Sequence, residues 1–129
     1  MPLFAPPISR QVLLGYVLGA NFNSTGDTAI SMRTSPYVVR RITVKNASIS
    51  LTTAAGGVYT APSKGGTAIV VATQVYTALT AAAKVLDMTL AAILTTDVRT
   101  EAELFFSLTT AQGAAATADI FVFGDDLSN

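Results

Sequence analysis

The sequence predicts an all-β fold: an antiparallel two-sheet jelly-roll sandwich of about eight strands, preceded by an extended N-terminal arm. Short apolar or alternating segments recur along the 129 residues, which is the pattern of β-strands. Clusters of Gly, Pro, Asn and Asp separate these segments about every ten residues, as turns do in a sandwich or barrel. The sequence contains no internal repeat of the kind that indicates a solenoid or a propeller. Two packed antiparallel sheets are therefore the architecture we expect.

Residues 1–8 are predicted to form the arm, and residues 9–129 a single domain. Pro2, Pro6 and Pro7 disfavour a helix and favour an extended polyproline II conformation. Burial would stabilise the apolar side chains of the arm, so we expect them to dock on a neighbouring subunit. A solvated terminus is the alternative. The candidate contact residues of the arm are Leu3, Phe4, Pro6, Pro7 and Ile8.

The first half of the domain contains the clearest predicted strand. Residues 11–18 are mostly apolar and precede a polar loop over residues 21–27, and residues 28–33 alternate with the period of a strand. Residues 37–51 are rich in β-branched side chains, which favour strands. Successive side chains of a strand point to opposite faces, so this segment should present two distinct sets. The first set is Val38, Arg40, Ile42 and Val44, and the second is Val39, Arg41, Thr43 and Lys45.

Glycine-rich turns mark the middle of the domain. A hairpin-type turn over residues 54–57 is predicted to lead into a strand over residues 58–61. Residues 62–66 contain a proline and two glycines and are predicted to form a second turn. A continuous apolar strand of the buried kind follows over residues 67–73.

The last third of the chain begins with an ambiguous segment. Residues 74–84 are alanine-rich and are predicted to form a loop or a helical turn. Residues 85–90 alternate with strand period. Residues 101–109 and 119–123 are the final predicted strands, and a flexible connection over residues 110–116 joins them.

The composition excludes most familiar kinds of active site. The chain contains no Cys, His or Trp. Missing Cys removes thiol nucleophiles, disulfides and the usual ligands of structural zinc, and missing His removes the commonest general base near neutral pH. We therefore expect no enzyme, no cofactor, no metal and no small-molecule substrate.

The charge and hydropathy of the chain indicate a partner that is itself a protein. Hydrophobic residues make up 50% of the chain and charged residues 12%, with eight basic and eight acidic side chains. This balance argues against nucleic acid, whose binding requires clustered Lys and Arg. Every apolar run is shorter than the about 20 residues that a membrane-spanning helix needs. The apolar excess is therefore expected to face other protein subunits and not a membrane.

Glu101 and Glu103 are the pair that most resembles a catalytic site. They lie two residues apart in a predicted strand, so their carboxylates should project on one face. A glycosidase needs two carboxylates about 5–9.5 Å apart in a cleft, and no third polar group lies in register here. We expect instead a solvated edge, or an ion pair with Arg99, Arg40 or Arg41.

Three weaker motifs are assigned to local structure. Residues 63–67 lack the G-x-x-x-x-G-K-[ST] order of a phosphate-binding loop, because the glycines follow the lysine. Asp119, Asp125 and Asp126 lack the ligand spacing of an EF-hand calcium loop. Asn46 is predicted to be a turn or bulge residue that ends the long strand.

Arg40 and Arg41 are the remaining candidate interface residues. Adjacent residues of a strand point to opposite faces. One of the two arginines is therefore expected to line a subunit interface or to find an acidic partner, since a buried unpaired guanidinium is costly. A strand with one solvated face is the alternative.

The elements in their order resemble small structural proteins of tailed bacteriophages. The resemblance rests on the Pro-containing arm, the run over residues 37–48, the turn over residues 56–61 and the terminal strand over residues 118–125. It spans most of the chain and is closest to capsid decoration, or cement, proteins with a jelly-roll body. It implies a homotrimer bound to the major capsid protein on the outer surface of the virion, assembled in the host cytoplasm.

On this basis we expect a viral structural protein that decorates and stabilises the capsid as a trimeric cement. Two alternatives stay open. A phage tail or head-to-tail component would have the same fold. A glycan-binding β-sandwich module would use tyrosines as platforms for sugar rings, as jelly rolls also serve in lectins. The tyrosines in question are Tyr16, Tyr37, Tyr59 and Tyr76.

Overall fold

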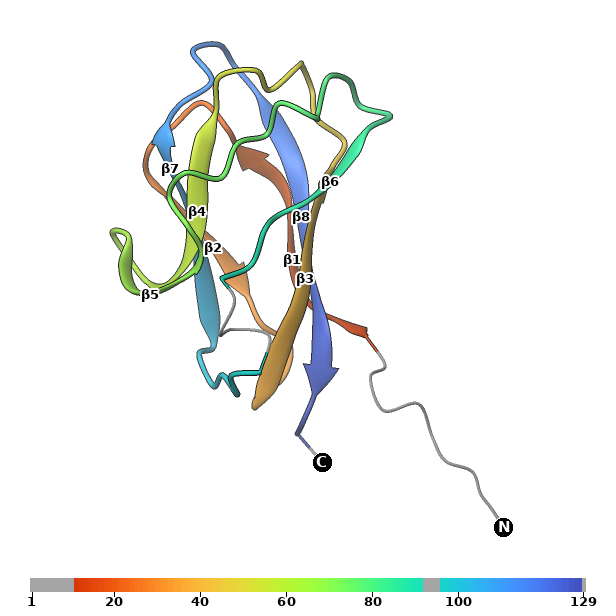
Figure 1. Cartoon of the computed structure of the whole chain (residues 1–129), viewed down its shortest axis with the longest axis vertical. Coiled ribbons are helices and arrows are strands. Elements are labelled where there is room, and N and C mark those ends of the chain that lie inside the picture. The colour runs from red at the N-terminus through yellow and green to blue at the C-terminus, as the bar shows by residue number, and fades with distance from the viewer. Residues whose placement is uncertain (1–10, 92–95, 129) are drawn as a thin grey trace.

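Eight antiparallel strands form two four-stranded sheets that pack face to face (Figure 1). The computed structural model describes residues 11–91 and 96–128, so the predicted arm lies outside the described residues. The strands are β1 (Val12–Asn21), β2 (Asp27–Ser31), β3 (Tyr37–Lys45), β4 (Ala55–Ala61), β5 (Gly65–Val70), β6 (Val85–Asp87), β7 (Glu103–Thr110) and β8 (Thr117–Asp126). The first sheet has the order β1-β8-β3-β6 and the second has the order β2-β7-β4-β5.

The pairing of the strands is that of a jelly roll. β1 pairs with β8, β2 with β7, β3 with β6 and β4 with β5, all antiparallel. The chain is thus wound like one long hairpin whose successive pairs alternate between the two sheets. The predicted antiparallel two-sheet jelly roll of about eight strands is confirmed. Among the described residues, none forms a helix of the length and hydropathy that crossing a membrane requires.

The core between the sheets centres on three buried aromatic rings. Phe22 follows β1, Tyr76 lies in the segment between β5 and β6, and Phe106 lies on β7. The ring centres of Phe22 and Phe106 are 4.7 Å apart, and Phe22 meets Tyr76 edge-on at 5.2 Å. The Tyr76 hydroxyl donates a hydrogen bond to the Gly56 carbonyl oxygen at 2.9 Å, which satisfies its polar atom within the core. Burial also raises the pKa of this hydroxyl, so it stays neutral.

A β-bulge in β3 overturns the predicted assignment of its faces. Val39 pairs with Gly124 and Arg41 with Phe123, so Arg40 is an extra residue on the β3 side. Consequently the β3 side chains that join the core between the sheets are Tyr37 and Val39 before the bulge and Ile42 and Val44 after it. The strand ends at Lys45, where Asn46 is predicted to end it, because Asn46 adopts a left-handed φ of 59°; the rest of the β segment predicted over residues 37–51 is not strand. The prediction that Asn46 is a turn residue is confirmed.

After β3, a predicted turn and a predicted strand differ from the structure. The glycines of the expected turn at residues 54–57 lie inside β4, where they allow close approach of neighbouring backbones: a Cβ on Gly57 would collide with the Val70 carbonyl oxygen. The strand predicted over residues 85–90 ends at Asp87. Residues 74–84 form a loop without a helical turn, and the turn predicted at residues 62–66 joins β4 to β5.

Candidate functional site

Arg40 and Arg41, the predicted interface pair, both lie on the outer side of the β1-β8-β3-β6 sheet. The Nε of Arg40 donates to Oδ2 of Asp125 at 3.0 Å, and its Nη2 lies 2.9 Å from the same oxygen. Arg41 is exposed, and its guanidinium carbon lies 4.6 Å from the centre of the Phe123 ring. Phe123 and Asp125 are two residues apart on β8 and share a face. The bulge therefore turns both arginines to one side, while the expected acidic partner is found for Arg40.

Arg41 ends a row of outward-facing side chains that crosses three strands. Leu13 on β1 lies opposite Phe123 on β8, which lies opposite Arg41 on β3. The neighbouring row runs across all four strands of the sheet. It consists of Tyr16, Phe121, Thr43 and Asp87.

The side chains of this second row contact one another closely. The rings of Tyr16 and Phe121 are stacked, with centres 6.2 Å apart and planes 20° apart. Lys45 comes from the next position along the outer face of β3, and its Nζ lies 5.1 Å from the centre of the Phe121 ring. The Thr43 hydroxyl donates to Oδ1 of Asp87 at 2.6 Å. Attraction between a cation and a ring quadrupole holds the two cations over the two phenylalanines.

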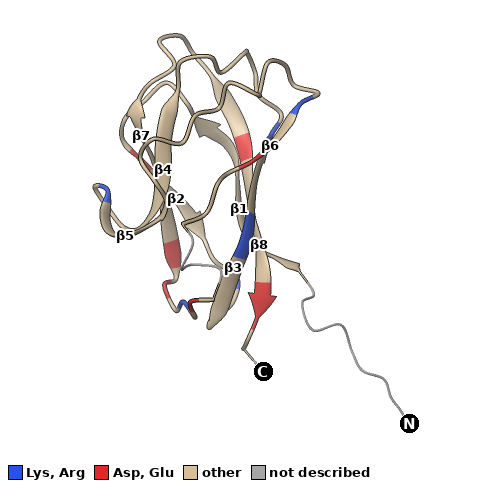
Figure 2. Cartoon of the chain, in the orientation of Figure 1, with Lys and Arg blue, Asp and Glu red and all other residues tan. Residues whose placement is uncertain are grey.

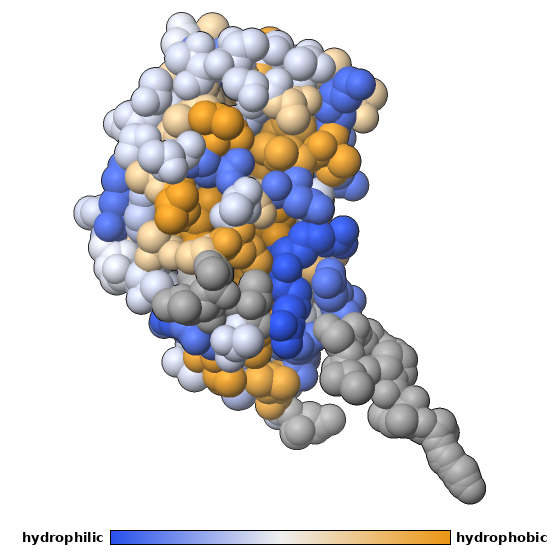
Figure 3. Space-filling view, viewed as in Figure 1, coloured by the Kyte–Doolittle hydropathy of each residue, from blue (hydrophilic) through white to orange (hydrophobic). Residues whose placement is uncertain are grey.

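We call this surface the aromatic face and define it by Leu13, Tyr16, Arg41, Lys45, Phe121 and Phe123. An open depression of ≈ 360 Å³ lies over all of these residues except Tyr16, and Thr43 and Val85 complete its lining. Tyr16 is 48% exposed, Val85 is 60% exposed, and Leu18, farther along β1, is 62% exposed. Figure 3 shows apolar residues reaching the surface between hydrophilic ones near β6. Contiguous exposed apolar side chains rimmed by polar ones are typical of a contact surface for another molecule.

Arg41 and Lys45 are the two charged residues of the aromatic face, and Asp87 and Asp119 lie beside it, opposite Thr43 and Lys45. Within the described part of the chain, neither Arg41 nor Lys45 forms an ion pair with a carboxylate. The carboxylates of Asp87 and Asp119 accept hydrogen bonds from neutral donors, which leave their negative charge in place. Asp87 accepts from Thr43, and Asp119 accepts from the Gly19 N–H at 2.8 Å and from the Asn46 amide at 2.7 Å. Figure 2 shows these charges distributed along β3, β8 and β6.

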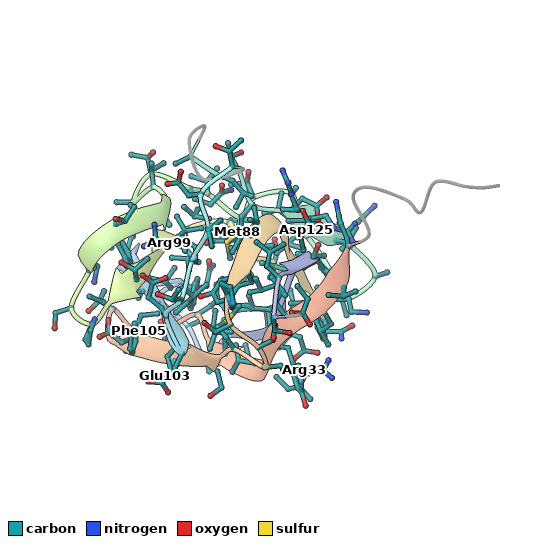
Figure 4. All side chains as sticks on the ribbon, turned by 90° about the horizontal axis from the view of Figure 1, so that it is seen from below. Arg33, Met88, Arg99, Glu103, Phe105 and Asp125 are labelled. Atoms are coloured by element: carbon teal, nitrogen blue, oxygen red, sulfur yellow. The ribbon has the colours of Figure 1, made fainter. Side chains whose placement is uncertain are left out.

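Glu101, the first residue of the glutamate pair, is held in an ion pair. Arg99 binds the carboxylate of Glu101 with two hydrogen bonds, Nε to Oε1 at 3.0 Å and Nη2 to Oε2 at 2.7 Å. These hydrogen bonds lower the pKa of Glu101 below its usual value of 4.5. The expected ion pair with Arg99 is thus confirmed. Seen from below, Glu103 and Asp125 lie on opposite sides of the sandwich (Figure 4), so these carboxylates do not converge on one site.

Lys64 supports the turn between β4 and β5. Its Nζ donates to the hydroxyl of buried Ser107 at 2.8 Å and to the Thr25 carbonyl oxygen at 3.1 Å. The ammonium is therefore engaged within the protein and is not displayed to a phosphate. In residues 11–91 and 96–128, no group of three His, Cys, Asp or Glu side chains is arranged to hold a metal ion.

The tyrosines considered for sugar binding are mostly internal. Tyr37, Tyr59 and Tyr76 are buried, and Tyr16 alone of the four is exposed. The sequence did contain one signal for the aromatic face, because Phe121 and Phe123 are spaced two apart in a predicted strand. The pairing of β8 with β3 brings those rings under Arg41 and Lys45. Local sequence patterns do not reveal which strands pair.

No protein-family model, no curated protein and no solved structure matches the chain. The aromatic face and the jelly-roll topology are therefore the features from which a function is inferred.

Proposed function

We propose that this chain is a viral structural protein that decorates and stabilises a capsid, binding the major capsid protein as a trimeric cement on the outer surface of the virion. The observation that carries the proposal is the aromatic face. Tyr16, Phe121 and Phe123 form a group of partly exposed rings beside two cations. Full burial of such a side chain against another subunit is worth about 1.5–3 kcal/mol.

The strand pairing beneath the aromatic face suits a protein that holds subunits together. The Phe121 and Phe123 rings stand on β8, the strand that is paired on both sides, with β1 on one edge and β3 on the other, and Tyr16 lies on β1 opposite Phe121. This pairing fixes the spacing of the rings, so little conformational entropy is lost when a partner binds. A cement protein must add apolar contact area between shell subunits and has no need of turnover or of a deep pocket. The trimeric state and the capsid partner come from the resemblance to decoration proteins.

A phage tail or head-to-tail component remains the alternative within the same class. Such a component would use the aromatic face in the same way and would differ in its position on the particle. Glycan binding is a second candidate, favoured by exposed Tyr16 stacked on Phe121 beside the Thr43–Asp87 hydrogen bond. A glycan array distinguishes this candidate, because a protein-binding face gives no saccharide signal there.

The proposal is tested on particles of the virus that encodes the chain. Particles that lack the protein are incubated with purified wild type, with Phe121→Ser, and with Phe105→Ser as a matched control on the outer side of the other sheet. Wild type and the control are expected to occupy the capsid in cryo-electron micrographs, and Phe121→Ser to occupy it poorly. Absence of the protein from native particles, or equal occupancy by all three, would overturn the proposal. Density on the tail in place of the head would establish the tail alternative.

A further inference from the structure

We propose that the aromatic face recognises an extended acidic segment of its protein partner, with two carboxylates four residues apart and an apolar side chain midway between them. The inference rests on the proposed function in taking the partner to be a protein. It adds the chemistry of the segment that is bound. The chemistry of the bound segment is inferred from the charges of the aromatic face, the distance between its two cations and the side chains that lie between them.

The two cations without an ion-pair partner favour an acidic occupant. Arg41 and Lys45 are exposed, and each lies over a phenylalanine ring and has no carboxylate partner among the described residues. The nearby carboxylates of Asp87 and Asp119 accept hydrogen bonds from the protein itself. Neutral donors leave both carboxylates charged, so they offset the two cations from the side, but neither forms an ion pair with Arg41 or Lys45. A carboxylate of the partner that reaches Arg41 or Lys45 directly therefore compensates the water that these cations lose on binding.

The spacing of the two cations selects an extended occupant. Arg41 and Lys45 are four residues apart on one face of a strand, so their Cα atoms are separated by about 13 Å. Residues four apart in an extended partner segment have the same separation and point to the same side. In a helix the same two positions would lie only about 6 Å apart along the axis. A partner strand laid along β3 thus reaches both cations with its first and fifth residues.

The apolar side chains between the two cations favour an apolar residue at the third position of the partner segment. In an extended segment the third residue points to the same side as the first and the fifth. Opposite it lies the depression of ≈ 360 Å³, floored by Phe121, Phe123 and Leu13. The recognised pattern is therefore acid-x-apolar-x-acid, where x marks residues that face away from the sheet.

The same contacts disfavour single-stranded nucleic acid as the occupant. Nucleic-acid platforms combine a basic groove with aromatic ring faces that are open to base stacking. Here Arg41 lies over the Phe123 ring and Lys45 over the Phe121 ring, so cations occupy the positions that bases would take. The formal net charge of the chain is zero.

The test is a titration of the ¹⁵N-labelled full-length chain, followed by amide chemical shifts. The probe is a blocked peptide with the core Glu-Thr-Leu-Thr-Glu. Two control peptides carry Lys in place of both Glu residues, or the same five residues with the two Glu adjacent. The probe is expected to shift amides of β1, β3 and β8 and to bind more tightly than either control. Raising the ionic strength from about 0.01 M to 0.15 M shortens the screening length from about 30 Å to 8 Å and should weaken binding.

Variants test whether Arg41 and Lys45 bind the probe peptide. The double variant Arg41→Gln/Lys45→Gln is expected to weaken binding by about five-fold or more, the loss expected for two exposed ion pairs. Lys84→Gln is the control: it removes an exposed lysine that does not line the depression and should change little. Unchanged thermal denaturation of each variant shows that the fold is retained.

Three results would overturn the inference: equal affinity for the probe and the rearranged peptide, no effect of the double variant, or tighter binding of an oligothymidylate than of the probe. The particle experiment separates this inference from the proposed function. Capsid occupancy that depends on Phe121, without any binding of the acidic probe, would reject the acidic segment and retain the capsid role. Probe binding by a chain that is absent from particles would reject the capsid role and retain the recognised pattern.

Discussion

Arg40 reaches from the bulge of β3 to Asp125 near the end of β8, where two of its nitrogens lie 3.0 and 2.9 Å from one carboxylate oxygen. The bulge makes this contact possible, because it turns Arg40 to the outer side of the sheet on which Asp125 lies. It also sets Arg41 over Phe123. One extra residue in one strand thereby positions both the ion pair and half of the charge on the aromatic face.

Gly124 is the residue on which the bulge depends. A Cβ at this position would collide with the Val38 carbonyl oxygen and would lie 2.8 Å from Cδ1 of Leu14. Gly124→Ala is therefore expected to lower the free energy of unfolding by about 1–3 kcal/mol, as overpacking of a well-packed site does. Urea denaturation measures the change. Gly26→Ala, whose nearest neighbour would be the Ser24 hydroxyl at 3.4 Å, is the control and should be nearly neutral.

The Arg40–Asp125 pair should couple energetically in a double-mutant cycle. The side chains are 33% and 15% exposed, so solvent screens the attraction only in part. We expect a coupling energy of about 1 kcal/mol from the stabilities of Arg40→Gln, Asp125→Asn and the double variant. Strictly additive single effects would show that the two side chains contribute independently.

Glu101 should make stability fall on the acid side. Hydrogen bonds from Arg99 lower the pKa of Glu101 in the folded protein below its usual value of 4.5. The contribution of Glu101 to the free energy of unfolding is therefore complete above pH 4.5. It is lost as the pH falls through the lowered pKa that Glu101 has in the folded protein. Glu101→Gln should be less stable than wild type near neutral pH and should approach wild type in acid. Urea midpoints across this pH range measure the difference, with the exposed Glu103→Gln as the control expected to leave the profile unchanged.

Lys64 should stabilise the turn between β4 and β5. Lys64→Met leaves the buried Ser107 hydroxyl without the ammonium donor 2.8 Å away, and a loss of about 1–3 kcal/mol is expected. Hydrogen exchange should accelerate first at amides of β5. Lys84→Met, at an exposed position, should change neither quantity. Equal protection of β5 in both variants would contradict a role for Lys64 in holding the turn.

Deletion of residues 1–8 tests the predicted arm. The two sheets and their core are formed by residues from Val12 onward, so the free energy of unfolding should stay within about 0.5 kcal/mol of the full chain. Occupancy on capsid particles should fall, because Leu3, Phe4 and Ile8 no longer reach a neighbouring subunit. Unchanged occupancy and unchanged thermal stability of the particle would show that these residues serve no assembly contact.

Local patterns were sufficient for the strands whose residues alternate and whose ends carry turn residues. The strand predicted over residues 28–33 agrees with β2 within two residues at each end, and the turn predicted over residues 62–66 is found at residues 62–64, with Gly65 and Gly66 already in β5. At Gly56 and Gly57 the local pattern predicts a turn, and the structure has a strand. A Cβ at Gly56 or Gly57 would collide with the backbone of Leu108 or Val70, so the glycines allow β4 to approach these backbones closely. This approach depends on strands that are distant in the sequence.

The sequence by itself determined the all-β class and the separation of apolar runs into two sheet faces, because period-two alternation and turn chemistry act over a few neighbouring residues. The absence of Cys and His likewise limited the chemistry before any fold was known. Tertiary structure alone decided which face each arginine occupies and which rings lie beneath Arg41 and Lys45. The physical reason is that a bulge shifts side chains by one position, and strand pairing joins residues about eighty apart, such as Arg41 and Phe123.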